Sequence, residues 1–210
     1  MRIAVCDVGL GNLRSVERAL REASKGTPLD VEITGDPGRI AAADQLVVPG
    51  QGGFGDCAKA LSGPLGDAVR EHLRRERPYL GICLGMQVLF GSSEEAVGCA
   101  GLGVLEGVVK RVPGGVDPET GGPLKIPHVG WNEAVPVADN RGLLGPGTEH
   151  FYFVHGYVVV PKDASLVAAT TGYGTAFVSA VARGNLFACQ FHPEKSQRAG
   201  LALLQRFLLS

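Results

Sequence analysis

The chain has 210 residues, of which 45% are hydrophobic and 20% are charged, proportions typical of a soluble globular protein with one well-buried core. Its formal net charge of −1 argues against sequence-independent nucleic-acid binding, which requires a basic surface. No apolar run approaches the ~20 residues needed to cross a bilayer, so we expect no association with a membrane.

The first half of the chain alternates short apolar strands with amphipathic helices. Leu13, Val16, Leu20 and Ala23, for example, recur at helical spacing. We expect strands at 2–7, 30–34, 45–48 and 78–82, and helices at 13–23, 56–77 and 84–90. This β-α-β order is typical of a parallel sheet covered by helices on both faces.

The second half consists mainly of strand-like segments separated by Gly, Pro and Asp. They lie at 104–112, 127–137, 151–160, 166–171, 177–183 and 186–191, and a last amphipathic helix is expected at 197–209. Gly184 and Asn185 predict a tight hairpin, and the segment 114–122 predicts a mobile hairpin tip. We therefore predict an α/β fold, a single domain over 1–210. Its mainly parallel central sheet is flanked by helices and extended by antiparallel strands and hairpins in the C-terminal half.

The cysteines indicate a reducing compartment. There are five, an odd number without a CxxC pair, which excludes an all-paired disulfide framework and a zinc-ribbon spacing. The N-terminal residues hold too short an apolar run for a signal peptide, so we expect a cytoplasmic protein. Four cysteines are interpreted as small buried apolar residues, namely Cys6, Cys57, Cys99 and Cys189.

Cys83 is the exception, because it lies in the pentapeptide GICLG (81–85) between a predicted strand and a predicted helix. This is the arrangement of a nucleophile elbow with Cys in place of Ser. The glycines allow a sharp turn that exposes the sulfur, and the start of the following helix favours thiolate over thiol. A glycine-rich turn that holds a buried, inert cysteine explains the same five residues.

A strand that ends in His-Pro-Glu adds to the case for catalysis. If the alternation of the strand continues through Pro193, His192 and Glu194 project on the same side. A carboxylate beside an imidazole fixes its tautomer and stabilises its protonated form, while the other ring nitrogen faces a nucleophile. The remaining histidines outside the motifs are interpreted as core or surface residues, namely His72, His128 and His150.

A glycine-rich segment, PGQGGF (49–54), follows the third predicted strand. Its unobstructed N–H groups suit the oxyanion of a tetrahedral intermediate, together with the N–H of Leu84 just after Cys83. A plain tight turn explains the glycines equally well. The sequence contains no GxxxxGK[ST] phosphate loop and no His/Cys/Asp cluster at metal-ligand spacing, so we expect no metal and no cofactor.

Together the motifs resemble a known family. PGQGGF (49–54), GICLGMQ (81–87) and FHPEKS (191–196) occur in the order typical of class I glutamine amidotransferases. Four further stretches are similar to the glutaminase subunits of imidazole-glycerol-phosphate synthases: CDVGLGNLRSVERAL (6–20), SSEEAVGCAGLGVLEGVVKR (92–111), PHVGWNE (127–133) and YFVHGY (152–157). The resemblance covers nearly the whole chain.

The resemblance implies that the chain hydrolyses the side-chain amide of glutamine and passes ammonia to a cyclase subunit of (β/α)8 barrel type. In this scheme Cys83 attacks the amide carbon, His192 moves the proton and Glu194 orients His192. The other implied site residues are the oxyanion donors Gly52 and Leu84, the substrate contacts Gly50, Gln87 and Glu95, and the partner contacts Asn12 and Lys195.

The chain departs from the family pattern at two positions. Gln51 replaces a small apolar residue in the oxyanion loop, and Gly156 replaces a residue that often carries a hydroxyl. Three alternatives remain open at this stage. They are a glutaminase that serves an anthranilate or guanylate synthase, a non-catalytic or redox-sensing α/β protein with an elbow thiol, and a cysteine peptidase.

Overall fold

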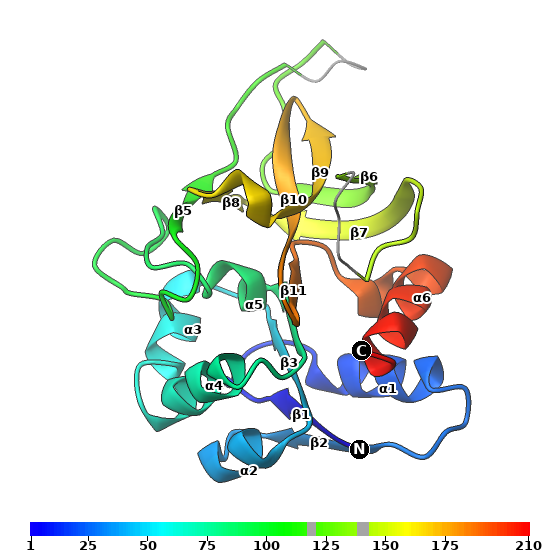
Figure 1. Ribbon diagram of the computed structural model, residues 1–210. Coiled ribbons are helices and arrows are strands. Elements are labelled where there is room, and N and C mark those ends of the chain that lie inside the picture. The colour runs from blue at the N-terminus through cyan, green and yellow to red at the C-terminus, as the bar shows by residue number, and fades with distance from the viewer. Residues whose placement is uncertain (117–120, 138–142) are drawn as a thin grey trace.

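A parallel sheet with helices on both faces forms the first half of the computed structural model, which describes residues 1–116, 121–137 and 143–210 (Figure 1). Its strands are β1 (Arg2–Cys6), β2 (Asp30–Thr34), β3 (Gln45–Gly50) and β4 (Tyr79–Cys83). Its helices are α1 (Leu13–Ala23), α2 (Pro37–Ala42), α3 (Phe54–Ala60), α4 (Pro64–Arg74) and α5 (Leu84–Gln87). The four strands are parallel and lie in the order β2-β1-β3-β4.

Antiparallel strands extend this sheet in the second half of the chain. They are β5 (Gly107–Arg111), β6 (His128–Pro136), β7 (Glu149–His155), β8 (Tyr157–Pro161), β9 (Val167–Tyr173) and β10 (Thr175–Arg183), with a 3-10 turn η1 (Ala164–Leu166) before β9. The chain then returns to the parallel half as β11 (Leu186–Cys189), followed by the 3-10 turn η2 (Pro193–Lys195) and α6 (Gln197–Leu208). The sheet runs β2-β1-β3-β4-β11-β10-β9-β6-β7, with β8 paired to both β10 and β5.

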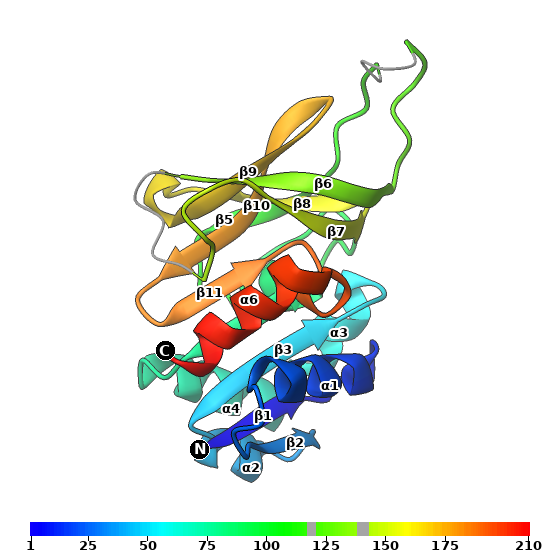
Figure 2. The same ribbon diagram turned by 90° about the vertical axis from the view of Figure 1, so that its right-hand side faces the viewer.

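Each face of the parallel strands has its own buried cluster. On one face α1 and α6 pack against each other, where Leu20 and Phe207 are buried (Figure 2). The other face is covered by α2, α3, α4 and α5, which bury Ile40, Phe54 and Val69 (Figure 1). The predicted α/β class and the antiparallel extension of the same sheet are thus confirmed.

The helices and strands of the first half agree with the sequence analysis, except at a proline that starts a new helix and at two short helices. The single helix expected at 56–77 is wrong, because α3 ends at Ala60 and α4 begins at Pro64. Proline starts a helix readily but has no N–H to continue one. The helix expected at 84–90 is confined to the four residues of α5, and the short α2, which is capped by Asp36, was not foreseen.

In the second half, the strand expected at 151–160 is two strands, β7 and β8, which are interrupted at Gly156. The tight hairpin is confirmed, since Arg183 pairs with Leu186 across Gly184 and Asn185. The hairpin tip expected at 114–122 includes 117–120, which lie outside the described residues. None of the helices in the described part of the chain is long and apolar enough to cross a membrane.

The topology brings the three sequence motifs to one edge of the sheet. β3, β4 and β11 are adjacent and parallel, so their carboxyl ends meet at that edge. β3 leads into PGQGGF, β4 ends at Cys83, and His192 follows β11. The carboxyl edge of such a sheet is where α/β proteins usually place their binding sites.

Candidate active site

Cys83 lies at a strained turn between β4 and α5. Its φ is +54°, which is unusual for a residue with a side chain and typical of strain kept at functional sites. Two glycines make the turn possible, because an added Cβ would lie 2.5 Å from Gly85 O at Gly81 and 1.7 Å from Val48 O at Gly85. The predicted elbow is therefore present. Since α5 is only one turn long, the helix-dipole effect invoked from the sequence is limited to the few N–H groups of that turn.

His192 and Glu194 meet through a turn rather than through strand alternation. β11 already ends at Cys189, and Pro193 begins η2, which brings Glu194 back toward the imidazole. His192 Nδ1 lies 2.8 Å from Glu194 Oε1, and both side chains are almost completely buried. The predicted pairing is confirmed, although the backbone that produces it differs from the expected extended strand.

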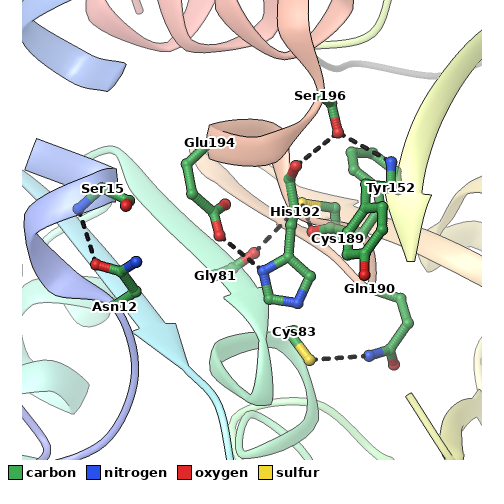
Figure 3. Close-up of polar contacts among 11 residues, drawn as sticks. Asn12, Ser15, Gly81, Cys83, Tyr152, Cys189, Gln190, His192, Glu194 and Ser196 are labelled. Atoms are coloured by element: carbon green, nitrogen blue, oxygen red, sulfur yellow. Dashed lines mark hydrogen bonds and ion pairs between the residues drawn. The ribbon is translucent and has the colours of Figure 1, made fainter. Parts of the chain in front are cut away.

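The other imidazole nitrogen faces the elbow cysteine. His192 Nε2 is directed toward Cys83 and has no hydrogen-bond partner among the described residues (Figure 3). Burial by itself lowers the pKa of His192, but Cys83 and Glu194 outweigh burial and raise that pKa to about 9. The imidazole therefore carries its proton at neutral pH, between the sulfur and the carboxylate. This is the charge arrangement of an activated Cys-His pair.

Backbone contacts hold His192 in place. His192 N donates to Tyr152 O at 2.9 Å, and Tyr152 N donates to Ser196 Oγ at 3.0 Å. Ser196 Oγ in turn donates to His192 O at 2.6 Å (Figure 3). The backbone of His192 is thus fixed to β7 as well as to its own turn.

A second polar contact reaches the sulfur from Gln190, a fully buried residue that the sequence analysis did not single out. Gln190 Nε2 donates to Cys83 Sγ at 3.4 Å (Figure 3). Gln190 Oε1 accepts from Gln87 Nε2 at 3.0 Å, and the same Gln87 nitrogen donates to Tyr157 O at 3.2 Å. Gln87 therefore lies behind the sulfur as well as in the wall of the pocket.

Two buried histidines support the same backbone carbonyl. His155 Nδ1 donates to Tyr157 O at 2.9 Å, so its Nε2 accepts from His128 Nδ1 at 3.1 Å. His128 Nε2 then accepts from Asn132 Nδ2 at 3.3 Å. Burial lowers the pKa of His128 to about 4 and that of His155 to about 3, so both rings are neutral at pH 7. From the sequence, His128 is interpreted as a core or surface residue. It is buried, and it forms hydrogen bonds with His155 and Asn132 in the interior.

The glycine-rich loop after β3 packs closely on the elbow. A Cβ at Gly50 would lie 2.7 Å from Leu84 Cβ, and Gly52 has a φ of +118° that favours glycine. Gly52 and Leu84 both line the pocket that contains Cys83. Glu95 Oε2 accepts from Phe54 N at 3.0 Å, which caps the first turn of α3 from outside the helix.

A pocket of about 300 Å³ joins these residues. Its lining consists of Gln51, Gly52, Cys83, Leu84, Gln87, Glu95, Tyr152, Val154, His155, Gly156, Tyr157, His192 and Lys195. A larger pocket of about 730 Å³ lies between charged side chains of α1, β2 and α2 and contains none of the predicted catalytic residues. Chemistry rather than size therefore identifies the candidate site. In the described part of the chain, no group of three or more His, Cys, Asp or Glu is arranged to hold a metal ion.

Most residues selected from the sequence lie in or behind this pocket. Glu194 stands behind His192, Gly50 lies beneath Leu84, and Asn12 lies outside the pocket lining. Asn12 Oδ1 accepts from Ser15 N at 3.2 Å and so caps α1. Lys195 is at the pocket, with its Nζ 5.6 Å from the centre of the Tyr152 ring. The pocket residues that were missed include Tyr152 and Val154, whose aromatic and apolar side chains carry no catalytic signature in a sequence.

The other cysteines differ from the elbow cysteine. Cys6, Cys57 and Cys189 are buried as predicted, and burial raises the pKa of Cys6 and of Cys57 to about 12. The pKa of the Cys189 thiol is also raised by burial. Cys99 is exposed, so the prediction that it is buried is wrong. It lies in the loop between α5 and β5, and its sulfur is 3.7 Å from the position that a Cβ on Gly55 of α3 would take.

Comparisons with known proteins agree with this chemistry. Residues 4–210 match the family described as glutamine amidotransferase class-I. Subunit HisH of imidazole glycerol phosphate synthase from Moorella thermoacetica is 47% identical over 98% of this chain and 93% of its own. The HisH subunit from Aquifex aeolicus is 46% identical over 99% of this chain and 96% of its own.

Solved structures show the same fold at lower sequence identity. A crystal structure of a glutamine amidotransferase superposes with a TM-score of 0.73 at 22% identity, covering 99% of this chain and 97% of that one. PurLQS from Thermotoga maritima superposes with a TM-score of 0.72 at 17% identity, with the same coverage. The chain therefore belongs to the class I glutamine amidotransferase family and, within it, to the group formed by the HisH subunits of imidazole glycerol phosphate synthases.

Proposed function

We propose that the chain is the glutaminase subunit of an imidazole glycerol phosphate synthase, in which the whole of 1–210 acts as one domain. It hydrolyses glutamine to glutamate and ammonia and delivers the ammonia to a cyclase subunit of (β/α)8 barrel type. The cyclase uses it to form imidazole glycerol phosphate and an aminoimidazole carboxamide ribotide in histidine biosynthesis. The observation that carries the glutaminase assignment is His192, held by Glu194 at 2.8 Å and directed at Cys83 within the 300 Å³ pocket.

In the first half of the reaction, the Cys83 thiolate attacks the side-chain amide carbon of glutamine. The carbonyl π electrons move to the oxygen, where the N–H groups of Gly52 and Leu84 stabilise the negative charge. Protonated His192 then gives its proton to the leaving nitrogen, so that the C–N bond breaks and ammonia departs. A glutamyl thioester on Cys83 remains, and His192 is left neutral.

In the second half, neutral His192 takes a proton from water as the water oxygen attacks the thioester carbon. Collapse of the second tetrahedral intermediate breaks the C–S bond, which releases glutamate and restores the thiolate beside protonated His192. The pKa of His192, raised to about 9, supports the acid role in the first half, because the resting pair carries the proton that the leaving nitrogen needs. Gln87 and Glu95 hold the amino-acid end of glutamine in this scheme, and Gly50 lets the loop approach the elbow.

The partner and the compartment belong to the same proposal. Asn12 begins α1 at the carboxyl end of β1, and Lys195 ends η2 at the pocket, so both lie at the edge of the sheet where ammonia is formed. We place the cyclase over that edge, in a heterodimer. All five cysteines are free thiols, which a reducing cytoplasm maintains.

Other partners and functions are less well supported. Relatives named as HisH subunits reach 47% identity over nearly the full chain, whereas PurLQS shares the fold at only 17% identity. A glutaminase for a different synthase is therefore disfavoured. A redox-sensing thiol has no need of a buried His-Glu pair directed at the sulfur, and this pair is the feature that separates an enzyme from that alternative.

The proposal is tested by reconstitution with a barrel-type cyclase. The complex is expected to form imidazole glycerol phosphate from either glutamine or ammonium salts, measured as product per unit time. The complex with Cys83→Ser is expected to keep the ammonium-dependent reaction and to lose the glutamine-dependent one. If the Cys83→Ser complex used glutamine as fast as the wild-type complex, the assignment of the nucleophile would be contradicted. If the chain bound no barrel-type cyclase, the assignment of the partner would be contradicted.

A further inference from the structure

Gln190 is a wholly buried polar residue beside the nucleophile, and the Cys-His-Glu chemistry leaves it without a role. It follows β11 directly, two residues before His192, and its backbone N donates to Ser179 O at 2.9 Å. Its side chain approaches Cys83 Sγ from a different direction than His192 does (Figure 3). The sulfur thus has an amide donor in addition to the imidazole.

The orientation of the Gln190 amide is fixed through Gln87 by the backbone carbonyl of Tyr157. Tyr157 O only accepts hydrogen bonds, so Gln87 must present its NH₂ group to it. The same NH₂ group meets Gln190, which must therefore present Oε1 to Gln87. The NH₂ group of Gln190 is then left to face Cys83 Sγ. A flipped Gln190 would place two NH₂ groups against each other and an oxygen against the sulfur.

The carbonyl itself is held from its other side. His155 Nδ1 donates to Tyr157 O, and the chain continues through His128 to Asn132 on β6. Both rings are neutral at pH 7, so every donor and acceptor in the chain has one defined role. The direction of the Gln190 amide is thereby set by the antiparallel layer of the fold, several residues away from the sulfur.

We propose that Gln190 is a positioning residue that orients the Cys83 sulfur and stabilises its thiolate through the hydrogen bond from Nε2. This inference rests on the proposed function and adds a residue to the machinery of that site. An N–H donor stabilises a thiolate more than a thiol, and an amide has no proton to exchange at neutral pH, so proton transfer stays with His192. Stabilising the thiolate raises the fraction of Cys83 that is thiolate, and it also lowers the intrinsic nucleophilicity of that thiolate. The second effect is the smaller one, so attack by Cys83 is faster at any pH at which most of the sulfur is still protonated.

Two substitutions separate this role from simple support of Gln87. Gln190→Glu keeps an oxygen that accepts from Gln87 but places a carboxylate, without a proton, against the sulfur. Because carboxylic acids are stronger acids than thiols, the introduced group is ionised and its negative charge opposes formation of the Cys83 thiolate. Gln190→Leu removes both contacts without adding a charge. Gln205→Glu makes the same change of charge on the half-buried face of α6 and serves as the matched control.

The readout is alkylation of Cys83 by iodoacetamide between pH 5.5 and 10, followed on the Cys83 peptide by mass spectrometry. The pH of half-maximal rate is expected to rise by about one unit or more in Gln190→Glu, and below the wild-type midpoint the rate is expected to fall by about threefold for each unit of that rise. Gln190→Leu is expected to shift in the same direction by a smaller amount, and Gln205→Glu is expected to match the wild type.

The proposal is overturned if Gln190→Glu keeps the wild-type alkylation profile. It is also overturned if the only defect of Gln190→Glu is a raised KM for glutamine and Gln190→Leu raises that KM further. If Gln190→Glu does not fold, judged by circular dichroism, an unshifted profile in folded Gln190→Leu overturns it as well. Alkylation needs no glutamine turnover. A wild-type chain that shows the expected profiles but releases no glutamate even in the ligand-loaded complex with the cyclase would therefore contradict the proposed function and leave the role of Gln190 intact.

Discussion

The surroundings of each cysteine, rather than its exposure, set its expected reactivity. Cys83 is only 7% exposed, yet it lines a pocket and faces a protonated imidazole. Cys99 is exposed but none of the described residues forms a hydrogen bond to its sulfur. The thiolate, not the thiol, reacts with electrophiles, so the buried sulfur beside His192 is the better nucleophile.

We therefore expect a glutamine-shaped electrophile, such as a diazoketone, to label Cys83 before any other cysteine. The pocket binds the reagent and the imidazolium stabilises the thiolate that attacks it. Cys83→Ser is expected to abolish both labelling and glutamine hydrolysis, with a melting temperature close to that of the wild type. The measurement is peptide mass spectrometry over time, with Cys99→Ser as the control. Faster labelling of Cys99 than of Cys83 would refute the expectation.

A second prediction concerns Glu95, which has two tasks. Its carboxylate lines the pocket and also accepts from Phe54 N at the start of α3. Glu95→Gln keeps an acceptor for Phe54 but loses the charge that attracts the ammonium group of glutamine. We expect it to raise the glutamine KM by about 10- to 100-fold with little change in kcat.

Glu95→Ala removes both contacts, so it is expected to lower kcat as well, because the glycine-rich loop between β3 and α3 loses its anchor. Steady-state glutamate release from the two variants decides the matter. A defect in kcat alone in Glu95→Gln would show that Glu95 does not bind the substrate.

The residues that sequence reasoning found are those whose chemistry is distinctive at a short spacing. Cys83 between two glycines and His192 two residues before Glu194 fall in this group. Gln190 stands in the same motif but carries no charge and no proton to exchange, so its role depended on knowing that Cys83 lies beside it. His155 reaches the pocket through a strand pairing that a single sequence does not reveal.

At the scale of elements, the antiparallel strands β6, β7 and β8 supply a rigid polar support for the site. His128 on β6 pairs with His155 on β7, and both rings are buried and neutral. Their pKa values, about 4 and about 3, lie below the ordinary value near 6.5 because burial disfavours the charged form. The unfolded chain therefore binds protons below pH 6.5 that the folded chain does not bind until about pH 4.

Stability is therefore expected to be unaffected by this pair above about pH 6.5 and to fall as the pH drops toward 4. For His128 alone, the loss of unfolding free energy between pH 6.5 and 4.5 is about 2 kcal/mol. His128→Gln should lose correspondingly less stability over that interval, as measured by urea unfolding. His150→Gln, a change at an exposed histidine on β7, is the control and should follow the wild type. Parallel pH profiles for all three chains would count against this account.

Helices and strands are predicted best where the spacing of apolar residues agrees with the positions of capping and chain-breaking residues. The bounds of α1 follow from its apolar spacing and the cap at Asn12. The segment 56–77 was misread because its helical spacing continues across Gly63 and Pro64, and the proline decides the boundary. The break at Gly156 between β7 and β8 has no comparable signal, since a glycine alone does not end a strand.

At the scale of the whole molecule, the order of strands creates the site. β3, β4 and β11 are neighbours in the sheet, although β11 follows the entire antiparallel half of the chain. The sequence indicated a parallel sheet and three motifs at strand ends, but it did not show that β11 lies beside β4. That pairing depends on the register of Leu186–Cys189 against Tyr79–Ile82, which only the folded structure specifies.

The same arrangement leads to a prediction about coupling between the two subunits. Ammonia released into water at neutral pH becomes mostly ammonium, which is not a nucleophile, so hydrolysis without an acceptor wastes glutamine. The loop 49–54 joins β3 to α3 beside the elbow, and glycine gives its peptide bonds a low barrier to rearrangement. In the free chain, we expect the Gln51–Gly52 peptide to direct its carbonyl, rather than its N–H, toward Cys83.

Glutaminase activity of the isolated chain is therefore expected to be low and to rise when the cyclase and its ligand bind over the carboxyl edge. Gaining one oxyanion donor is worth about 3–4 kcal/mol, so the increase is expected to be on the order of 10³-fold in kcat. The chain has Gln51 where the family resemblance leads us to expect a small apolar residue, and a Gln51→Val variant tests whether its amide holds one state of the loop through local hydrogen bonds. Steady-state ammonia release is compared between the isolated chain and the ligand-loaded complex, for the wild type and for Gln51→Val. Equal rates in the two states of the wild type would mean that the oxyanion hole is always formed, and gating by this loop would then be excluded.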